Sequence, residues 1–169
     1  IRLPLRAIYT APPTEPKSMA SILSAATESL RGLRALIVDD EEDVRLVLTM
    51  TLESYGARTH AISSGRQALE LLDRQTPYER FDVLICDIGM PDEDGYSVIR
   101  KVRKLPVEKG SQIPAIALTA YGRAEDRVRA LGAGFQMHIA KPVEPVELVV
   151  AVRSLIERGW QSKVNTGVR

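Results

Sequence analysis

Cysteine, aromatic residues and long apolar runs are all scarce in this sequence of 169 residues. The single cysteine, Cys86, cannot form an internal disulfide, so we expect a reducing compartment, the cytoplasm. Aromatic residues make up 5% of the chain. No apolar stretch is long enough to span a bilayer, and no signal-peptide pattern is present. We therefore expect no membrane contact by this chain, although a longer parent protein could be membrane-anchored.

The net charge is small but unevenly distributed. The chain carries a formal charge of +1, yet residues 34–158 hold 17 basic and 20 acidic residues. The excess of positive charge lies in the flanking segments, 1–33 and 159–169. A mildly acidic central region argues against a nucleic-acid-binding surface. A basic cluster, Arg100, Lys101, Arg103 and Lys104, is interpreted as a solvated helix face.

Short apolar runs alternate with helical patterns from residue 33 onward. The runs predict strands at 35–38, 58–61, 83–86, 114–118 and 135–140. Apolar spacing predicts helices over 41–55, 65–75, 96–105, 123–131 and 145–158, and places Val47, Val128 and Leu131 on inward faces. Strands that alternate with helices over short connections indicate an α/β fold, a doubly wound five-stranded parallel sheet with helices on both faces.

Residues suited to phosphate or metal chemistry follow four of the five predicted strands. These strand-end residues are Asp39, Asp40, Asp87, Thr119 and Lys141. In a sheet of strand order 2-1-3-4-5, they meet in one crevice at the topological switch point. Clustered carboxylates repel one another, and a hard divalent cation such as Mg²⁺ relieves that repulsion. A carboxylate there can also act as a nucleophile toward phosphorus, while Lys141 supplies charge and Thr119 a hydroxyl donor.

Each strand-end residue also has an ordinary structural interpretation. Asp87 is suited to starting a turn, Asp39 and Asp40 to capping a helix, and Lys141 to lying in solvent. For each residue considered alone, the structural interpretation is favoured over the functional one. Five such placements together favour a functional site.

The spacing of these residues resembles the receiver domain of two-component response regulators, a CheY-like, flavodoxin-like fold. The resemblance covers residues 33–158 and rests on four motifs: Asp39-Asp40, Asp87 with Met90-Pro91 and Gly95, Leu118-Thr119-Ala120, and Lys141-Pro142. It implies strand order 2-1-3-4-5.

The resemblance also implies roles for individual residues. Asp87 would accept a phosphoryl group from phosphohistidine. Mg²⁺ would be held by Asp39, Asp40, Asp87 and the backbone carbonyl of Gly89. Lys141, with a cis bond to Pro142, would bind the phosphoryl oxygens, and Thr119 would signal the change.

Two positions depart from the family pattern. The switch position, three residues before the lysine, usually holds Tyr or Phe and is His138 here. Either this histidine switches between exposed and buried positions, or it is simply a partly buried strand residue. Gly89 has no side chain to orient an attacking water, so we expect slow hydrolysis of the phosphoaspartate.

The segments outside 33–158 bear on the parent protein. Residues 1–9, with Ile1 to Leu5, resemble the end of a histidine-kinase ATP-binding domain. Residues 10–32 predict a linker, with a short helix favoured over 19–31, and 159–169 a tail. These features, and the missing initial Met, favour the C-terminal receiver of a hybrid sensor histidine kinase, although the fragment itself has no kinase motifs.

Other parents and other classes of function stay open. A stand-alone, single-domain response regulator is the alternative parent. A Mg²⁺-dependent aspartyl-phosphate phosphatase or an unphosphorylated interaction module are less favoured. Expected partners are a histidine kinase or its phosphohistidine domain, in cis or in trans, a histidine phosphotransfer protein, and a second copy in a homodimer.

Overall fold

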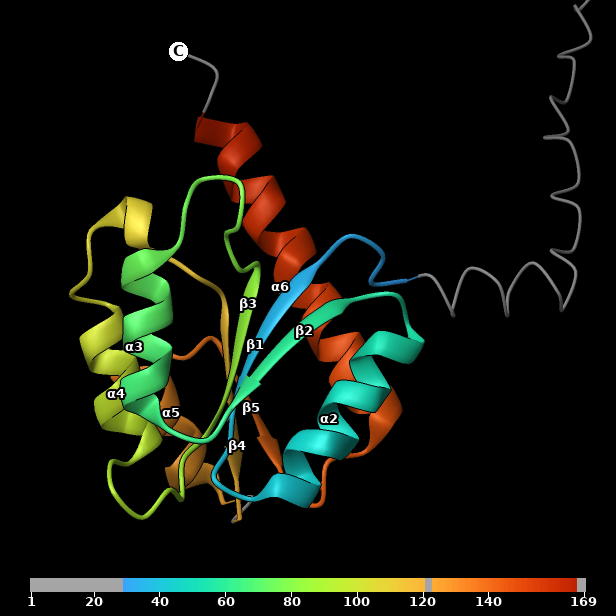
Figure 1. Ribbon diagram of the computed structural model, residues 1–169, viewed down its shortest axis with the longest axis vertical. Helices are drawn as coiled ribbons and strands as arrows, with labels where there is room; N and C mark the ends of the chain where they lie inside the picture. Colours follow the sequence, from blue (N-terminus) through green and yellow to red (C-terminus); the bar gives the residue numbers. More distant parts are fainter. Residues whose placement is uncertain (1–28, 121–122, 167–169) are drawn as a thin grey trace, which may run out of the picture.

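The fold is centred on one parallel five-stranded sheet (Figure 1). A computed structural model describes residues 29–120 and 123–166, without the side chains of 158–166. The strand order is β2-β1-β3-β4-β5, as predicted. The strands are β1 (Arg34–Val38), β2 (Arg58–Ile62), β3 (Val83–Asp87), β4 (Ala115–Thr119) and β5 (Met137–Ala140).

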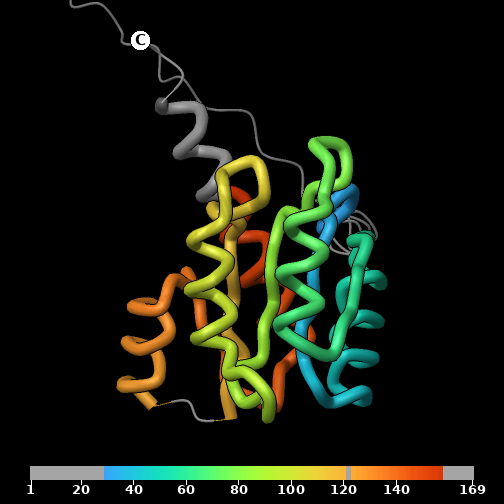
Figure 2. The backbone as a smooth tube through the Cα atoms, turned by 60° about the vertical axis from the view of Figure 1, so that its left-hand side comes forward, coloured from blue at the N-terminus to red at the C-terminus, as the bar shows by residue number. Residues whose placement is uncertain are grey.

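Helices cover both faces of the sheet. On one face lie α3 (Gly65–Arg74), α4 (Gly95–Val102) and α5 (Ala124–Ala133), side by side in Figure 2. On the other face lie α2 (Glu42–Ser54) and α6 (Pro145–Thr166), with a short 3-10 helix at Val107–Lys109 elsewhere in the chain. The sheet thus separates two apolar cores, one under α2 and α6 and the other under α3, α4 and α5.

The central strands are fully buried, which agrees with their continuous apolar sequences. Every residue of β3 and β4 is buried, whereas β2 at the sheet edge is largely exposed. Strands covered on both faces need no alternation of polar and apolar residues. The residues that follow β1, β3 and β4 are therefore attached directly to the buried centre of the sheet.

Helix starts are set by local chemistry. Asp94 caps α4, because its Oδ1 accepts a hydrogen bond of 2.7 Å from the Ser97 amide. Ser64 caps α3 in the same way at 3.4 Å to the Gln67 amide. Pro145, as predicted, is the first residue of α6, where its missing N–H costs nothing.

Several details differ from the sequence predictions. Helix α6 runs to Thr166 rather than Arg158, and α4 ends at Val102 rather than Leu105. No proline interrupts the residues after Arg158, so α6 can continue past the predicted end.

Three apolar side chains predicted to face inward are exposed: Val47, Val128 and Leu131. Helix α5 packs instead through the small residue Ala130, which lets it lie close to the sheet. Val47 is about 100° around α2 from the buried Leu48.

Arg103 is not a solvated member of a basic face. Its guanidinium donates hydrogen bonds to the backbone carbonyls of Gly134, Ser111 and Ile113, at distances from 2.7 to 2.9 Å. Burial lowers the pKa of this guanidinium. Arg103 therefore ties the end of α4 to the loops before β4 and β5.

The described chain enters the domain at the C-terminal end of α2. Leu30 is fully buried, and its amide donates to the Tyr55 carbonyl at 2.9 Å. Residues 29–32 form turns, so the helix expected over 19–31 does not reach residue 31, and its remainder lies outside the described residues. Within the described residues, no helix combines the length and apolar character needed to cross a membrane.

Candidate functional site

The carboxyl ends of β1 and β3 bring the predicted acidic residues together. These strands are neighbours, with Val38 paired to Cys86, so the residues that follow them lie side by side. One carboxylate oxygen from each of Asp39, Asp40 and Asp87 lies within 4.8 Å of the others. Asp39 and Asp87 are 0% and 4% exposed, whereas Asp40 faces solvent. The predicted acidic cluster is therefore present.

Lys141 lies between the two buried carboxylates. Its Nζ is 2.9 Å from Oδ2 of Asp39 and 3.0 Å from Oδ1 of Asp87. The backbone places it there, because the Lys141 amide donates to the Thr119 carbonyl at 2.7 Å. The Lys141–Pro142 bond is cis, as expected.

For both Asp87 and Lys141, burial and the opposite charge of the partner shift the pKa in opposite directions. Burial raises the pKa of Asp87, and the Asp39 and Asp40 charges add to this, while Lys141 opposes it. Burial lowers the pKa of Lys141, but hydrogen bonds and attraction from Asp39 and Asp87 outweigh burial and leave it above its usual range. One ammonium therefore does not fully compensate the clustered carboxylates.

The donor set fits a hard cation. Oδ1 of Asp39 accepts a hydrogen bond of 3.0 Å from the Glu41 amide. No described residue gives Oδ2 of Asp39 a well-angled hydrogen bond, although Lys141 is close. Three carboxylates facing one point, one of them open to solvent, match the oxygen ligands and retained waters that Mg²⁺ prefers.

Gly89 and Gly95 bring backbone close to Asp87. A Cβ at position 89 would lie 3.5 Å from Oδ2 of Asp87. A Cβ at position 95 would lie 2.3 Å from the Asp87 carbonyl oxygen, which leaves no room for a side chain. The sequence motif included Gly95, but its spacing did not predict this close approach.

Thr119 and His138 occupy the two predicted switch positions. Thr119 is 4% exposed at the end of β4, one residue beyond the pair formed by Asp87 and Leu118. His138 is in β5, paired with Ala117, and its ring is partly buried. Its Nε2 atom is buried without a hydrogen-bond partner among the described residues.

Arg45 and Glu41 belong to the site although the sequence did not single them out for it. Nη1 of Arg45 donates to the carbonyls of Asp39 and Asp40, at 2.7 and 2.8 Å. Oε1 of Glu41 is 3.4 Å from the Lys141 ammonium. The sequence did contain one signal for Arg45. It follows Asp39 by six residues and Asp40 by five, and it lies in the first turns of the predicted helix.

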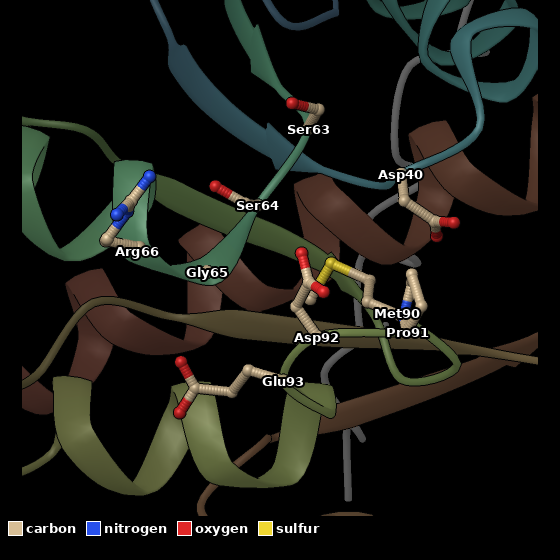
Figure 3. A pocket seen from close by; sticks show the side chains of 9 residues that line it. All are labelled: Asp40, Ser63, Ser64, Gly65, Arg66, Met90, Pro91, Asp92 and Glu93. Carbon is tan, nitrogen blue, oxygen red and sulfur yellow. The ribbon is translucent and has the colours of Figure 1, made fainter.

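A cavity of about 410 Å³ adjoins the cluster (Figure 3). Asp40 is on its rim, and the rest of its wall comes from the loop that starts α3 and the loop between β3 and α4. Figure 3 shows Ser63 and Ser64 on one side and Pro91, Asp92 and Glu93 on the other. Asp87 and Lys141 do not line it, so the cavity borders the acidic cluster without containing it.

Comparison with known families matches this geometry to one domain type. The family described as "Response regulator receiver domain" matches residues 35–153. The chain belongs to this family. The receiver fold and strand order expected from the motifs are thereby confirmed.

Two relatives indicate the range of proteins that contain such a receiver. The chain is 43% identical over 126 residues to an "uncharacterized 14.6 kDa protein in sodA1 3'region" of Leptolyngbya boryana, covering 75% of this chain and 92% of that protein. It is 38% identical to the probable transcriptional regulator ycf27 of Guillardia theta, covering 74% of this chain. The receiver spans 46% of that regulator's length.

A solved structure provides a further comparison. The receiver domain of the sensor histidine kinase PA1611 from Pseudomonas aeruginosa is 34% identical, with a TM-score of 0.66. The match covers 75% of this chain and 98% of that one. That structure has a magnesium ion coordinated in its active-site cleft.

Proposed function

We propose that this receiver takes a phosphoryl group from a phosphohistidine onto Asp87. The observation that carries the proposal is the placement of Asp87, nearly buried at the end of β3 and 3.0 Å from the Lys141 ammonium. A carboxylate oxygen of Asp87 attacks phosphorus, the P–N bond breaks, and its electron pair leaves with the imidazole. An acyl phosphate on Asp87 is the product.

The surrounding residues support this transfer electrostatically. In this proposal Lys141, 3.0 Å from Asp87, neutralises charge on the phosphoryl oxygens, and Thr119, buried at the end of β4, donates its hydroxyl to one of them. Asp39, Asp40, Asp87 and the Gly89 carbonyl would hold Mg²⁺. When bound, the cation would supply positive charge that offsets the repulsion between the carboxylates and the incoming phosphoryl group.

We infer that the parent protein is a response regulator, rather than the hybrid sensor kinase expected from residues 1–9. The ycf27 relative and the 14.6 kDa relative, which this chain covers over 92% of its length, support this inference. Residues 1–9 lie outside the described part of the chain. A phosphorylatable histidine helix and ATP-binding motifs encoded upstream of Ile1 would contradict it.

The partner class follows from the proposed chemistry. A donor must present phosphohistidine to the open side of the acidic cluster, where Asp40 is exposed. A histidine kinase or a histidine phosphotransfer protein has this chemistry. Binding of nucleic acid by the receiver is not part of the proposal.

Labelling tests the phosphoacceptor directly. Incubation with radiolabelled acetyl phosphate and Mg²⁺ is expected to label the wild type and not Asp87→Asn. Asp92→Asn is the matched control, because Asp92 is an exposed acid of the following loop and lies outside the cluster. Equal labelling of Asp87→Asn and wild type would overturn the assignment of Asp87.

A further inference from the structure

Arg45 donates hydrogen bonds to three successive backbone carbonyls in the connection between β1 and α2. Its Nη1 bonds the carbonyls of Asp39 and Asp40 at 2.7 and 2.8 Å, and its amide bonds the Glu41 carbonyl at 3.1 Å. Arg45 is the fourth residue of α2, so its partly buried side chain reaches back over the residues that precede the helix. One side chain thus holds the backbone that carries two of the three clustered carboxylates.

The two bonds from the guanidinium hold the backbone on both sides of Asp40. The Asp39 carbonyl belongs to the peptide group before the Cα of Asp40, and the Asp40 carbonyl belongs to the peptide group after it. Because each peptide group is planar, fixing both groups sets the φ and ψ angles of Asp40. These angles determine the direction of the Cα–Cβ bond, and Arg45 therefore orients the Asp40 carboxylate through the backbone.

Asp40 depends on this restraint more than Asp39 does. Asp39 is fully buried, its amide donates to the Ile62 carbonyl at 3.2 Å, and its Oδ2 is 2.9 Å from the Lys141 ammonium. Asp40 is exposed, so packing does not fix its position. The bond from Arg45 reaches the backbone of Asp40 and leaves both carboxylate oxygens available to a ligand.

The charge of Arg45 has the opposite effect on a cation. A guanidinium stays protonated in proteins, and a positive charge beside the acidic cluster repels Mg²⁺. Considered as a charge alone, Arg45 weakens cation binding. Considered as a restraint on Asp40, it strengthens binding, because a ligand that is already ordered loses less conformational entropy when the cation binds. The sign of the effect of Arg45 on Mg²⁺ affinity therefore shows which contribution is larger.

We propose that Arg45 is a positioning residue for the cation, and that its restraint of Asp40 outweighs its repulsion of Mg²⁺. The proposal rests on the Mg²⁺ site of the proposed function. Arg45 gives the site an oriented, solvent-facing carboxylate before the cation arrives, and it does so without a carboxylate contact of its own.

Two neutral variants of similar side-chain length separate the restraint from the charge. Arg45→Gln keeps an amide N–H donor, whereas Arg45→Met has none. Titration of the full chain with Mg²⁺, followed by the NMR signals of the backbone amides, gives the affinity. We expect Arg45→Met to bind Mg²⁺ about tenfold more weakly than the wild type, or weaker still, and Arg45→Gln to lie between the two. An effect of charge alone would make both variants bind more tightly than the wild type, and equally.

Arg66→Met is the matched control for charge. Arg66 is an exposed arginine on the wall of the cavity that Asp40 borders (Figure 3). Its removal takes a positive charge from this region and leaves the carbonyl bonds of Arg45 in place. We expect Arg66→Met to bind Mg²⁺ as tightly as the wild type or more tightly. A loss equal to that of Arg45→Met would contradict the positioning role.

The remaining outcomes separate this proposal from the proposed function. Wild-type or tighter Mg²⁺ binding by Arg45→Met would refute the role of Arg45 and leave the cation site intact. A wild type that does not bind Mg²⁺ would remove the site, and the proposal with it. Urea unfolding in EDTA shows whether each variant is folded. If Arg45→Met does not fold, Arg45→Gln decides the question, and binding as tight as that of the wild type or tighter would overturn the proposal.

Discussion

The ammonium of Lys141 lies 3.0 Å from Oδ1 of Asp87 and is the basic group nearest to that carboxylate among the described residues. The same ammonium is shared with Asp39 at 2.9 Å. Asp40 adds a third carboxylate within the cluster. The site thus carries excess negative charge, and this excess makes its stability sensitive to cations and to pH.

Magnesium should stabilise the folded receiver. At a free Mg²⁺ concentration of 100 times Kd, ligand binding contributes about 2.7 kcal/mol to the free energy of unfolding. For a domain of this size that corresponds to a rise in Tm of roughly 5–10 °C. We expect Asp40→Asn to lose most of this rise, as measured by thermal denaturation with and without Mg²⁺. Asp92→Asn should retain it, and a full rise in Asp40→Asn would exclude Asp40 as a ligand.

Without divalent cations, Asp87 should make the receiver less stable as the pH rises. The pKa of Asp87 is raised in the folded state above its ordinary value of 3.8. The folded state therefore binds the Asp87 proton more tightly than the unfolded state does. This protonation contributes fully to the free energy of unfolding below pH 3.8, and the contribution is lost as the pH rises through the raised pKa. Asp87→Asn should be more stable than wild type at neutral pH, with a difference that narrows toward about pH 4.

Urea denaturation in EDTA at several pH values measures this difference. Asp92→Asn serves as the control and should follow the wild-type pH dependence. A stability difference between Asp87→Asn and wild type that does not change with pH would show that burial does not control the ionisation of Asp87.

Hydrolysis of the phosphoaspartate should respond to the side chain at position 89. A Cβ there would lie 3.5 Å from Oδ2 of Asp87, an ordinary contact distance. An amide at this position could orient water, so we expect Gly89→Asn to shorten the lifetime of the labelled protein about tenfold or more. Gly89→Ala adds the carbon without the polar group and should leave the lifetime near that of wild type. Loss of label from the wild type within seconds would contradict the expected slow hydrolysis.

Arg103 should be a stability determinant that lysine cannot replace. Its planar guanidinium donates hydrogen bonds to three backbone carbonyls, a geometry that a single ammonium cannot reproduce. Arg103→Lys is expected to lower the free energy of unfolding by about 2–3 kcal/mol. Arg100→Lys, an exposed change within α4, the helix that Arg103 follows, should alter it by less than about 0.5 kcal/mol. Denaturant unfolding of both variants makes the comparison.

Sequence patterns predicted the sheet well because the central strands are buried on both faces. The apolar runs at β1, β3 and β4 have no competing interpretation, and the residues that follow them identify the site. Patterns failed where a helix packs through small residues, as α5 does with Ala130, or where an apolar residue such as Val47 lies to the side of the buried stripe.

Roles that depend on contacts with backbone atoms elsewhere in the fold also could not be predicted from the sequence. Arg103 looked like one cation among four until the fold brought the Gly134 carbonyl to it. Gly95 was recognised only as a member of the motif around Asp87, and the fold shows that the Asp87 carbonyl occupies the space a side chain would need. In both cases the partner is supplied by tertiary structure, which local spacing does not encode.

The bonds from Arg45 to the carbonyls of Asp39 and Asp40 have a thermodynamic consequence. They attach α2 to the two carboxylates that follow β1, so a shift of this helix moves both groups. Any contact on α2 that favours one helix position must then change the affinity of the cluster for a cation. By linkage, the cation changes the strength of that contact by the same factor. A cation bound at the cluster and a contact made on α2 would thus be reciprocal effectors of one another.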